Sequence, residues 1–121
     1  MRNNFEDSHL LKKQQENEIL VAEQKREDEI KMEMGKLLKK IRVRQGLDIK
    51  VIAEKKTFEK TTIYNVEKGI AFPSKTTLKK LLSVYQMTEE EKQKIAALHI
   101  EVTTIRDVRK KRNLKKRYQW G

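Results

Sequence analysis

Basic and small polar side chains gather at the start of a short segment between Lys60 and Lys68. The same segment carries Ile63 and Val66, whose spacing of three places both on one face of a helix. A second short amphipathic segment, residues 49–56, precedes it and holds Ala53, which is small enough for two helices to cross closely. Two short helices joined by a tight turn, the second opening with polar and basic residues, have the geometry that fits a helix into the major groove of DNA.

The helices that must position these two segments are marked by capping residues. Gly46 is suited to end the helix before them, and Asp48 is suited to begin the first of them. Ser74 is a suitable N-cap for the next helix, and Thr88 with Glu91 fits a capping box that opens the last one. Because the chain has only four Gly and one Pro in 121 residues, we predict an all-α fold.

The apolar side chains at helical spacing within residues 35–98 predict the core. They are Leu37, Leu38, Ile41, Ile52, Phe58, Ile63, Val66, Leu78, Leu81, Leu82 and Tyr85. The clearest amphipathic face follows Ser74, and the helix after Thr88 carries a further inner stripe that begins at Ile95. His99 is expected on the surface of that helix or partly buried, without a role as a ligand.

A specific motif closes the second of the two short helices: Glu67-Lys68-Gly69, followed by Pro73-Ser74. With this motif the chain resembles the helix-turn-helix family of phage Cro and lambda repressor, often called Xre-type, over residues 35–98. The resemblance implies a five-helix domain in which the first helix is fixed to the third by an ion pair. Here that pair would join Arg42 to Glu67.

The resemblance also implies which side chains contact DNA. The family's recognition helix corresponds to residues 60–68, and the positions that meet base edges are Lys60, Thr61, Tyr64 and Asn65. The types are suitable, since Asn can bind adenine, Lys can bind guanine and Thr can contact a thymine methyl group or a phosphate. Phosphate contacts, which position the protein without specifying sequence, are expected at Lys50, Lys68 and Lys75. Members of the family commonly bind palindromes as dimers, with recognition helices about one DNA turn apart.

Three positions depart from the family's pattern. Ile49 stands where the family usually has a Gln that grips a phosphate, and Lys56 stands where an apolar residue is preferred. Thr57 replaces the usual Gly of the turn, although a β-branched residue is poorly suited to positive φ. These differences leave open a distorted turn, an altered phosphate contact or a fold retained for another partner.

The net charge of +11 is unevenly distributed along the chain. Residues 1–34 carry a net charge of −3, residues 35–98 carry +8 and residues 99–121 carry +6. We therefore predict an acidic helical arm at 1–34, the helix-turn-helix domain at 35–98 and a basic helical extension at 99–121. A surplus of positive charge attracts polyanions, of which nucleic acid is the first candidate.

The arm and the extension each leave alternatives open. The arm has one thin apolar stripe that includes Ile19, Ala22, Ile30 and Met34, and it is either a solvated, partly frayed helix or a surface for self-association or a protein partner. The basic extension is either a solvated charge run or a second set of phosphate contacts. The residues concerned are Arg109, Lys110, Arg112, Lys115, Lys116 and Arg117. The acidic arm could also dock on the basic extension of the same chain or of a symmetry mate.

Composition excludes several classes of protein. There is no Cys and there are only two His, so we expect no disulfide, no metal site and no cofactor. No apolar run approaches the roughly 20 residues of a membrane span, and no signal peptide is evident, so we expect a cytoplasmic, nucleoid-associated protein without a membrane partner. Because no nucleophile elbow, phosphate loop or metal-ligand cluster occurs, we do not expect an enzyme.

The leading hypothesis is a sequence-specific regulator of transcription that binds double-stranded DNA as a homodimer. The alternative is a protein-interaction module of a mobile element, such as an antirepressor, an antitoxin or an inhibitor of a nucleic-acid enzyme, which would bind its partner through the arm or the basic surface. An accessory factor that brings a recombinase or relaxase to its DNA site would have the same sequence features as a repressor.

Overall fold

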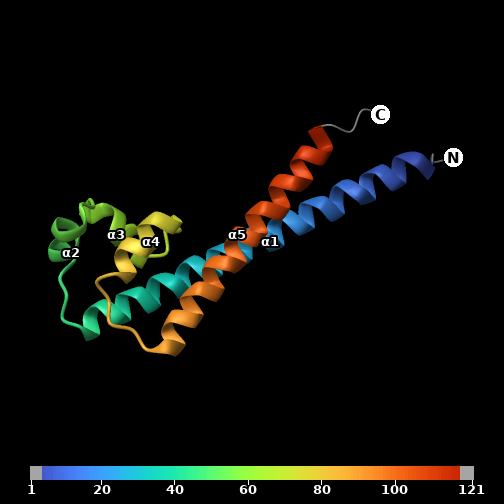
Figure 1. Cartoon of the computed structure of the whole chain (residues 1–121). Coiled ribbons are helices and arrows are strands. Elements are labelled where there is room, and N and C mark those ends of the chain that lie inside the picture. Colours follow the sequence, from blue (N-terminus) through green and yellow to red (C-terminus); the bar gives the residue numbers. More distant parts are fainter. Residues whose placement is uncertain (1–3, 118–121) are drawn as a thin grey trace.

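The structure is a computed structural model that describes residues 4–117. Within that range it consists of five α-helices without a strand, which confirms the all-α prediction (Figure 1). The helices are α1 (Asn4–Arg44), α2 (Ile49–Lys56), α3 (Lys60–Glu67), α4 (Lys75–Leu82) and α5 (Glu89–Arg117). The three short helices lie together beside one end of the two long ones.

Helix α1 unites the predicted arm and the predicted first helix of the domain in one element of 41 residues. No Gly or Pro precedes Gly35, so the sequence contains no residue that would interrupt the helix. Gly35 lies inside α1 where α3 crosses it, because a Cβ atom there would lie 2.5 Å from the carbonyl oxygen of Val66. After α1 the chain turns at Gly46, whose φ of 68° is the left-handed conformation expected of a helix-ending glycine.

The short helices begin at the predicted caps. The carboxylate of Asp48 accepts a hydrogen bond of 3.1 Å from the backbone N–H of Lys50, and the hydroxyl of Ser74 accepts one of 3.1 Å from the backbone N–H of Thr77. Helix α3 ends one residue before the predicted limit, with Lys68 as its C-cap. These caps satisfy N–H groups that would otherwise lack partners, so helices of only eight residues can form.

Helix α5 contains both the last helix of the predicted domain and the basic extension. It opens with the predicted capping box, in which Glu91 accepts from the backbone N–H of Thr88 at 3.0 Å and donates its own backbone N–H to the Thr88 hydroxyl at 3.1 Å. The helix then continues for 29 residues to Arg117. The extension is therefore a direct continuation of the helix that packs on the core.

The core lies where α1 and α5 meet the short helices. Most of the predicted core side chains are buried, while Leu37, Phe58 and Leu82 are partly buried against them. The buried apolar residues are Ile30, Met34, Leu38, Ile41, Ile52, Ala53, Ile63, Val66, Leu78, Leu81, Tyr85, Ile95, Leu98 and Val102. The apolar stripe of the arm joins this core only from Ile30 onward, since Ile19 and Ala22 are exposed.

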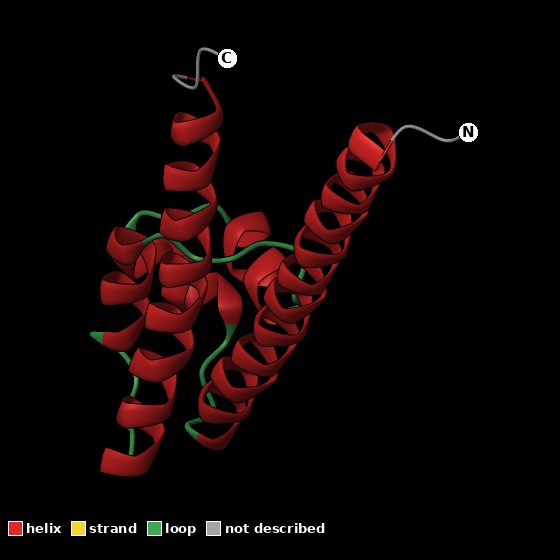
Figure 2. Ribbon diagram, turned by 90° about the vertical axis from the view of Figure 1, so that its right-hand side faces the viewer, coloured by secondary structure: helices red, strands yellow, loops and turns green. Residues whose placement is uncertain are grey.

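Oppositely charged side chains connect α1 to the basic half of α5. Arg112 donates to the carboxylate of Glu23 at 2.6 Å, and a guanidinium nitrogen of Arg109 lies 3.3 Å from the carboxylate of Glu27, which is only 3% exposed. The later part of the acidic arm, which contains Glu23 and Glu27, thus docks on the basic extension of its own chain, one of the arrangements considered from the sequence. Beyond these pairs the two long helices diverge, as Figure 2 shows.

An aromatic contact fixes the loop between α3 and α4 to α5. The ring of Phe72 stacks on His99 with ring centroids 5.1 Å apart, and the guanidinium of Arg106 lies 5.2 Å from the centroid of Phe72. His99 therefore supports the packing of this loop.

No helix within residues 4–117 is both long enough and apolar enough to cross a membrane. In the same range, no three His, Cys, Asp or Glu side chains are grouped in a way that could hold a metal ion.

Candidate nucleic-acid interface

Helix α3 presents a polar face to solvent because its apolar face is anchored in the core. Ile63 and Val66 are 1% and 3% exposed, whereas Lys60 and Thr61 are exposed on the outer side of the helix. Tyr64, one turn after Lys60, is 49% exposed. The outer face therefore offers an ammonium group, a hydroxyl and a phenol at positions 60, 61 and 64, and these groups can donate to or accept from base edges.

Asn65 differs from the other three predicted base contacts. It is partly buried at the edge of the outer face, and its backbone carbonyl accepts from the N–H groups of Ile70 at 2.9 Å and Ala71 at 3.2 Å. Its position is thus fixed by the turn that follows α3. Its side chain does not line the pocket in which Lys60, Thr61 and Tyr64 meet.

The N-terminal ends of α2 and α3 enclose a shallow pocket on this face. It is lined by Asp48, Ile49, Lys50, Lys60, Thr61 and Tyr64. Lys50, predicted to contact phosphate, is thereby brought beside the predicted base contacts. Ile49 is partly buried and supplies an apolar side chain where the family's pattern has an amide. The pocket thus combines an apolar wall with two lysines.

Tyr64 and Lys68 form a joined unit one turn apart. The ammonium nitrogen of Lys68 lies 4.3 Å from the centroid of the Tyr64 ring, which is within the range of a cation–π contact. The hydrogen bond and the positive charge of Lys68 lower the pKa of Tyr64, and the charge of Lys39 acts in the same direction. Lys68 therefore lies over the ring and brings positive charge to the end of the face.

Lys39 of α1 is a cation of this face that the sequence analysis did not identify. It is exposed and lines a small cavity together with Arg42, Tyr64 and Lys68. It lies three residues before Arg42 and so on the same side of α1, but the sequence alone does not place that side of α1 beside α3. The remaining predicted phosphate contact, Lys75, is exposed at the start of α4 and lines neither pocket described for this face.

The predicted ion pair between Arg42 and Glu67 is present and fixes the face relative to α1. Two guanidinium nitrogens of Arg42 donate to the two carboxylate oxygens of Glu67 at 2.6 and 2.9 Å, and a third bond of 2.9 Å reaches the carbonyl of Leu47. The side chains are 13% and 5% exposed, and the pairing raises the pKa of Arg42. A bidentate pair of this kind restricts orientation as well as distance, so α1, α3 and the loop between α1 and α2 are held as one unit.

The turn between α2 and α3 has the backbone expected at the family's glycine position, although the residue is Thr57. Its φ of 59° and ψ of 49° are left-handed, and its backbone N–H donates to the carbonyl of Ala53. The residue at this position therefore has a left-handed backbone although it is Thr and not Gly. The substitution places a β-branched residue in a conformation that favours Gly.

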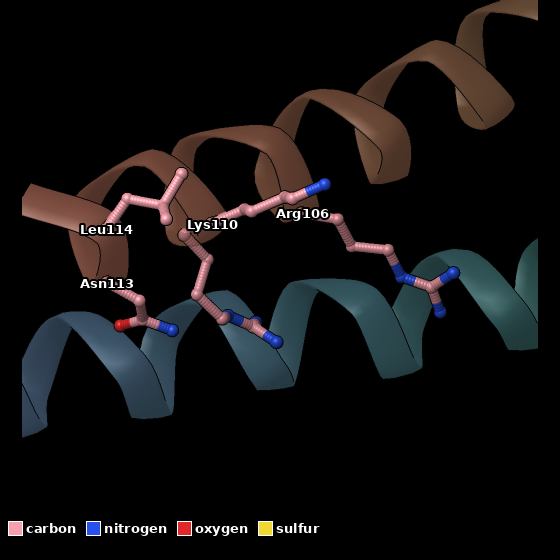
Figure 3. A pocket seen from close by; sticks show the side chains of 5 residues that line it. Arg106, Lys110, Asn113 and Leu114 are labelled. Carbon is pink, nitrogen blue, oxygen red and sulfur yellow. The ribbon is translucent and has the colours of Figure 1, made fainter. Parts of the chain in front are cut away.

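The cations of α5 divide into internally paired and exposed groups. Arg109 and Arg112 pair with acidic residues of α1, whereas the side chains of Lys110 and Lys115 are exposed. In Figure 3 Arg106 reaches from α5 toward α1, and Lys110 lines the same pocket. The side chains of Lys116 and Arg117 lie outside the described residues.

A family model described as a helix-turn-helix domain matches residues 33–95, just over half of the chain. Neither the curated proteins nor the solved structures gave a match. The matched range begins within α1, includes α2, α3 and α4, and ends within α5, so it covers the exposed face of α3 and the pair that holds it. The chain belongs to the helix-turn-helix domain family.

Proposed function

We propose that this protein is a sequence-specific regulator of transcription of the phage-repressor, Xre type, which binds double-stranded DNA by inserting α3 into the major groove. The observation that supports this best is the outer face of α3, where Lys60, Thr61 and Tyr64 are exposed while the Arg42–Glu67 pair holds the helix rigidly. A helix anchored on one side and polar on the other can enter the groove without unfolding part of the domain.

The side chains divide into two roles. Lys60, Thr61, Tyr64 and Asn65 would contact base edges and so determine sequence preference. Lys50, Lys68 and Lys75, joined by Lys39, would contact phosphates and set the orientation of the domain on the duplex. The exposed Lys110 and Lys115 of α5 are candidates for further phosphate contacts, whereas Arg109 and Arg112 would first have to leave their carboxylate partners.

The test is selection of bound duplexes from a random DNA pool with the full chain, followed by titration of the selected site. We expect one sequence motif to be enriched, and we expect Tyr64→Ala and Asn65→Ala to weaken binding to the motif more than binding to random DNA. Lys92→Ala, an exposed lysine of α5 outside the proposed face, is the matched control. If Tyr64→Ala and Asn65→Ala change neither affinity nor sequence preference, the assignment of α3 as the reading helix is wrong.

A second candidate function is a protein-interaction module that retains the helix-turn-helix fold. It is favoured by the apolar Ile49 at the phosphate-gripping position and by the exposed apolar side chains of the arm. This function predicts that a protein partner is recovered in stoichiometric amount. It also predicts DNA binding without sequence preference and with a steep salt dependence. In either case we place the protein in the cytoplasm, and for the regulator we propose a homodimer at the nucleoid.

A further inference from the structure

Three arginines of α5 share two carboxylates of α1 at the junction of the two long helices. Arg112 donates a hydrogen bond of 2.6 Å to Glu23. Nη2 of Arg109 lies 3.3 Å from Oε1 of Glu27, and Nε of Arg106 lies 3.8 Å from the same oxygen. Nε of Arg109 also lies 3.8 Å from Oε1 of Glu23. The guanidinium groups of this junction therefore outnumber its carboxylates.

Arg109 is the least well satisfied of the three arginines. Arg112 makes a hydrogen bond, and the guanidinium of Arg106 lies over the ring of Phe72. By contrast, Nε and Nη2 of Arg109 are buried without a hydrogen-bond partner in the described part of the chain. Buried donors in native proteins are nearly always hydrogen-bonded, so Arg109 holds two donors that another acceptor could satisfy.

The two carboxylates do not depend on Arg109 alone. If its guanidinium moves away, Glu27 still has Arg106 beside it. Glu23 likewise keeps its hydrogen bond to Arg112. A remaining partner is needed because Glu27 is only 3% exposed, and an unpaired buried charge is costly. Arg109 can thus exchange its carboxylates for another anion while both carboxylates stay paired.

A pocket lies beside Arg109 on one side of α5. Its volume is about 440 Å³, and it is lined by Arg106, Arg109, Lys110, Asn113 and Leu114. Figure 3 shows the side chains of Arg106 and Asn113 extending from α5 toward α1. Lys110 and Asn113 are exposed, so an ammonium group and a side-chain amide can donate to a ligand that enters from solvent. Binding pockets commonly measure about 300–1,000 Å³, so this one admits a phosphate group with part of the molecule that carries it.

The charge of the junction is positive. Its cations are those of Arg106, Arg109, Lys110 and Arg112. They outnumber the two carboxylates of α1 by two. Asp107, the only acidic residue of α5 after residue 101, is exposed and does not line the pocket. A phosphate group carries about one negative charge as a diester and nearly two as a monoester, so the excess charge suits one phosphate group.

We propose that Arg109, Lys110 and Asn113 bind one phosphate group at the junction of α1 and α5. A guanidinium can form two parallel hydrogen bonds to phosphate oxygens, so Arg109 gains the directional bonds that its contacts with the carboxylates lack. Lys110 adds positive charge, and the side-chain amide of Asn113 adds donors. The phosphate belongs either to a nucleic-acid backbone or to a free monoester, because both present the same oxygens. The site lies on α5 and does not depend on the proposed role of α3.

The first measurement is titration of the full chain with inorganic phosphate. Nuclear magnetic resonance follows the backbone amide signals of residues 106–114 and the side-chain amide signals of Asn113. Sodium chloride at the same ionic strength is the reference. We expect these signals to shift in a saturable way with phosphate and not with chloride. Equal shifts with both salts, or no shift with phosphate, would overturn the proposal.

Arg109→Gln tests the central residue of the site. It should weaken phosphate binding by about tenfold or more, because hydrogen bonds to a charged group are lost. Lys92→Gln removes the same charge from an exposed residue of α5 outside the pocket and should leave phosphate binding nearly unchanged. Thermal melts should show that both variants remain folded, since each carboxylate of α1 keeps an arginine. Equal phosphate binding by the two variants would exclude Arg109 from the site and refute the proposal.

A second pair of variants leaves the ion pairs of the junction intact. Asn113 and Gln93 are both exposed on α5, and an acidic residue at either position adds one negative charge. Asn113→Asp should weaken phosphate binding about fivefold or more through like-charge repulsion, whereas Gln93→Glu should change it little. Equal effects of the two substitutions would mean that phosphate responds only to net charge, which contradicts a site in the pocket.

Titration of random-sequence duplex DNA distinguishes the two sources of phosphate, and this measurement alone rests on the proposed function. If the site takes a phosphate of the DNA backbone, Arg109→Gln should lower the salt-dependence slope by about 0.9, and Lys92→Gln should not. An unchanged slope in Arg109→Gln, together with weakened binding of inorganic phosphate, would assign the site to a free monoester. Failure of the proposed function would appear as the absence of a selected DNA motif and would leave the phosphate titration unaffected.

Discussion

Replacement of Thr57 by Gly is expected to stabilise the protein, although it removes a side chain. Thr57 is exposed and is the C-cap of α2, with a φ of 59°. Its hydroxyl makes no hydrogen bond to the described part of the chain that would be lost. The substitution therefore changes the backbone energy of the turn and little else.

The expected size of the effect follows from two opposing contributions. A residue with a Cβ atom in the left-handed conformation costs about 1–2 kcal/mol, which Gly avoids. Gly loses more backbone freedom on folding, which costs roughly 0.5–1 kcal/mol. The difference predicts that Thr57→Gly raises the free energy of unfolding by about 0.5–1 kcal/mol, or the Tm by about 2–6 °C.

The measurement is urea unfolding followed by circular dichroism, with a control at a threonine in an ordinary helical conformation. Thr76 is exposed in α4, so Thr76→Gly should lower the free energy of unfolding by a few tenths of a kcal/mol. Opposite signs for the two Thr→Gly substitutions are the expected result. If Thr57→Gly destabilises the protein as Thr76→Gly does, the turn does not have the left-handed backbone described above.

Three further predictions concern the packing, the site and the acid response. Gly35→Ala should lower the free energy of unfolding by about 1–3 kcal/mol or more, as measured by urea unfolding, because its Cβ would lie 2.5 Å from the Val66 carbonyl oxygen. If Ile49 covers a thymine methyl group, replacing that thymine of the selected site by deoxyuridine should weaken binding about fourfold, because one methyl contact is lost. Ile49→Gln should then bind both duplexes equally well. Equal binding of both duplexes by the native protein would contradict the contact. Arg44 and the Thr88 backbone lower the pKa of Glu91 to about 2, so its stabilising contribution should be full above pH 4.5 and lost as pH falls toward 2. In melts between pH 2 and 6, Glu91→Gln should lose this part of the acid sensitivity.

Local features of the fold were predictable because they depend on neighbours in sequence. The caps at Asp48 and Ser74 follow from side chains that bond N–H groups two or three residues later, and these bonds are present. The pair between Arg42 and Glu67 was predictable from the family's pattern, although its two residues lie on different helices.

The relation between α1 and α5 was only partly predictable. Opposite charges favour docking of the arm on the extension, but charge attraction is not directional and cannot select a register between two long helices. The observed register, with Glu23 against Arg112 and Glu27 against Arg109, also depends on the packing of Ile30 and Val102 in the core. Lys39 was missed for a related reason, since its place beside the outer face of α3 depends on how α1 crosses that helix.

The continuity of α1 connects residues 9–22 rigidly to the helix-turn-helix domain. No Gly or Pro separates residue 9 from Gly35, so the helix has none of the usual sites of a sharp kink along about 39 Å. A rigid tilt of 10° at the crossing with α3 would displace the far end of the arm by about 7 Å. An event that reorients the N-terminal part of α1 would therefore be transmitted directly to the orientation of α3.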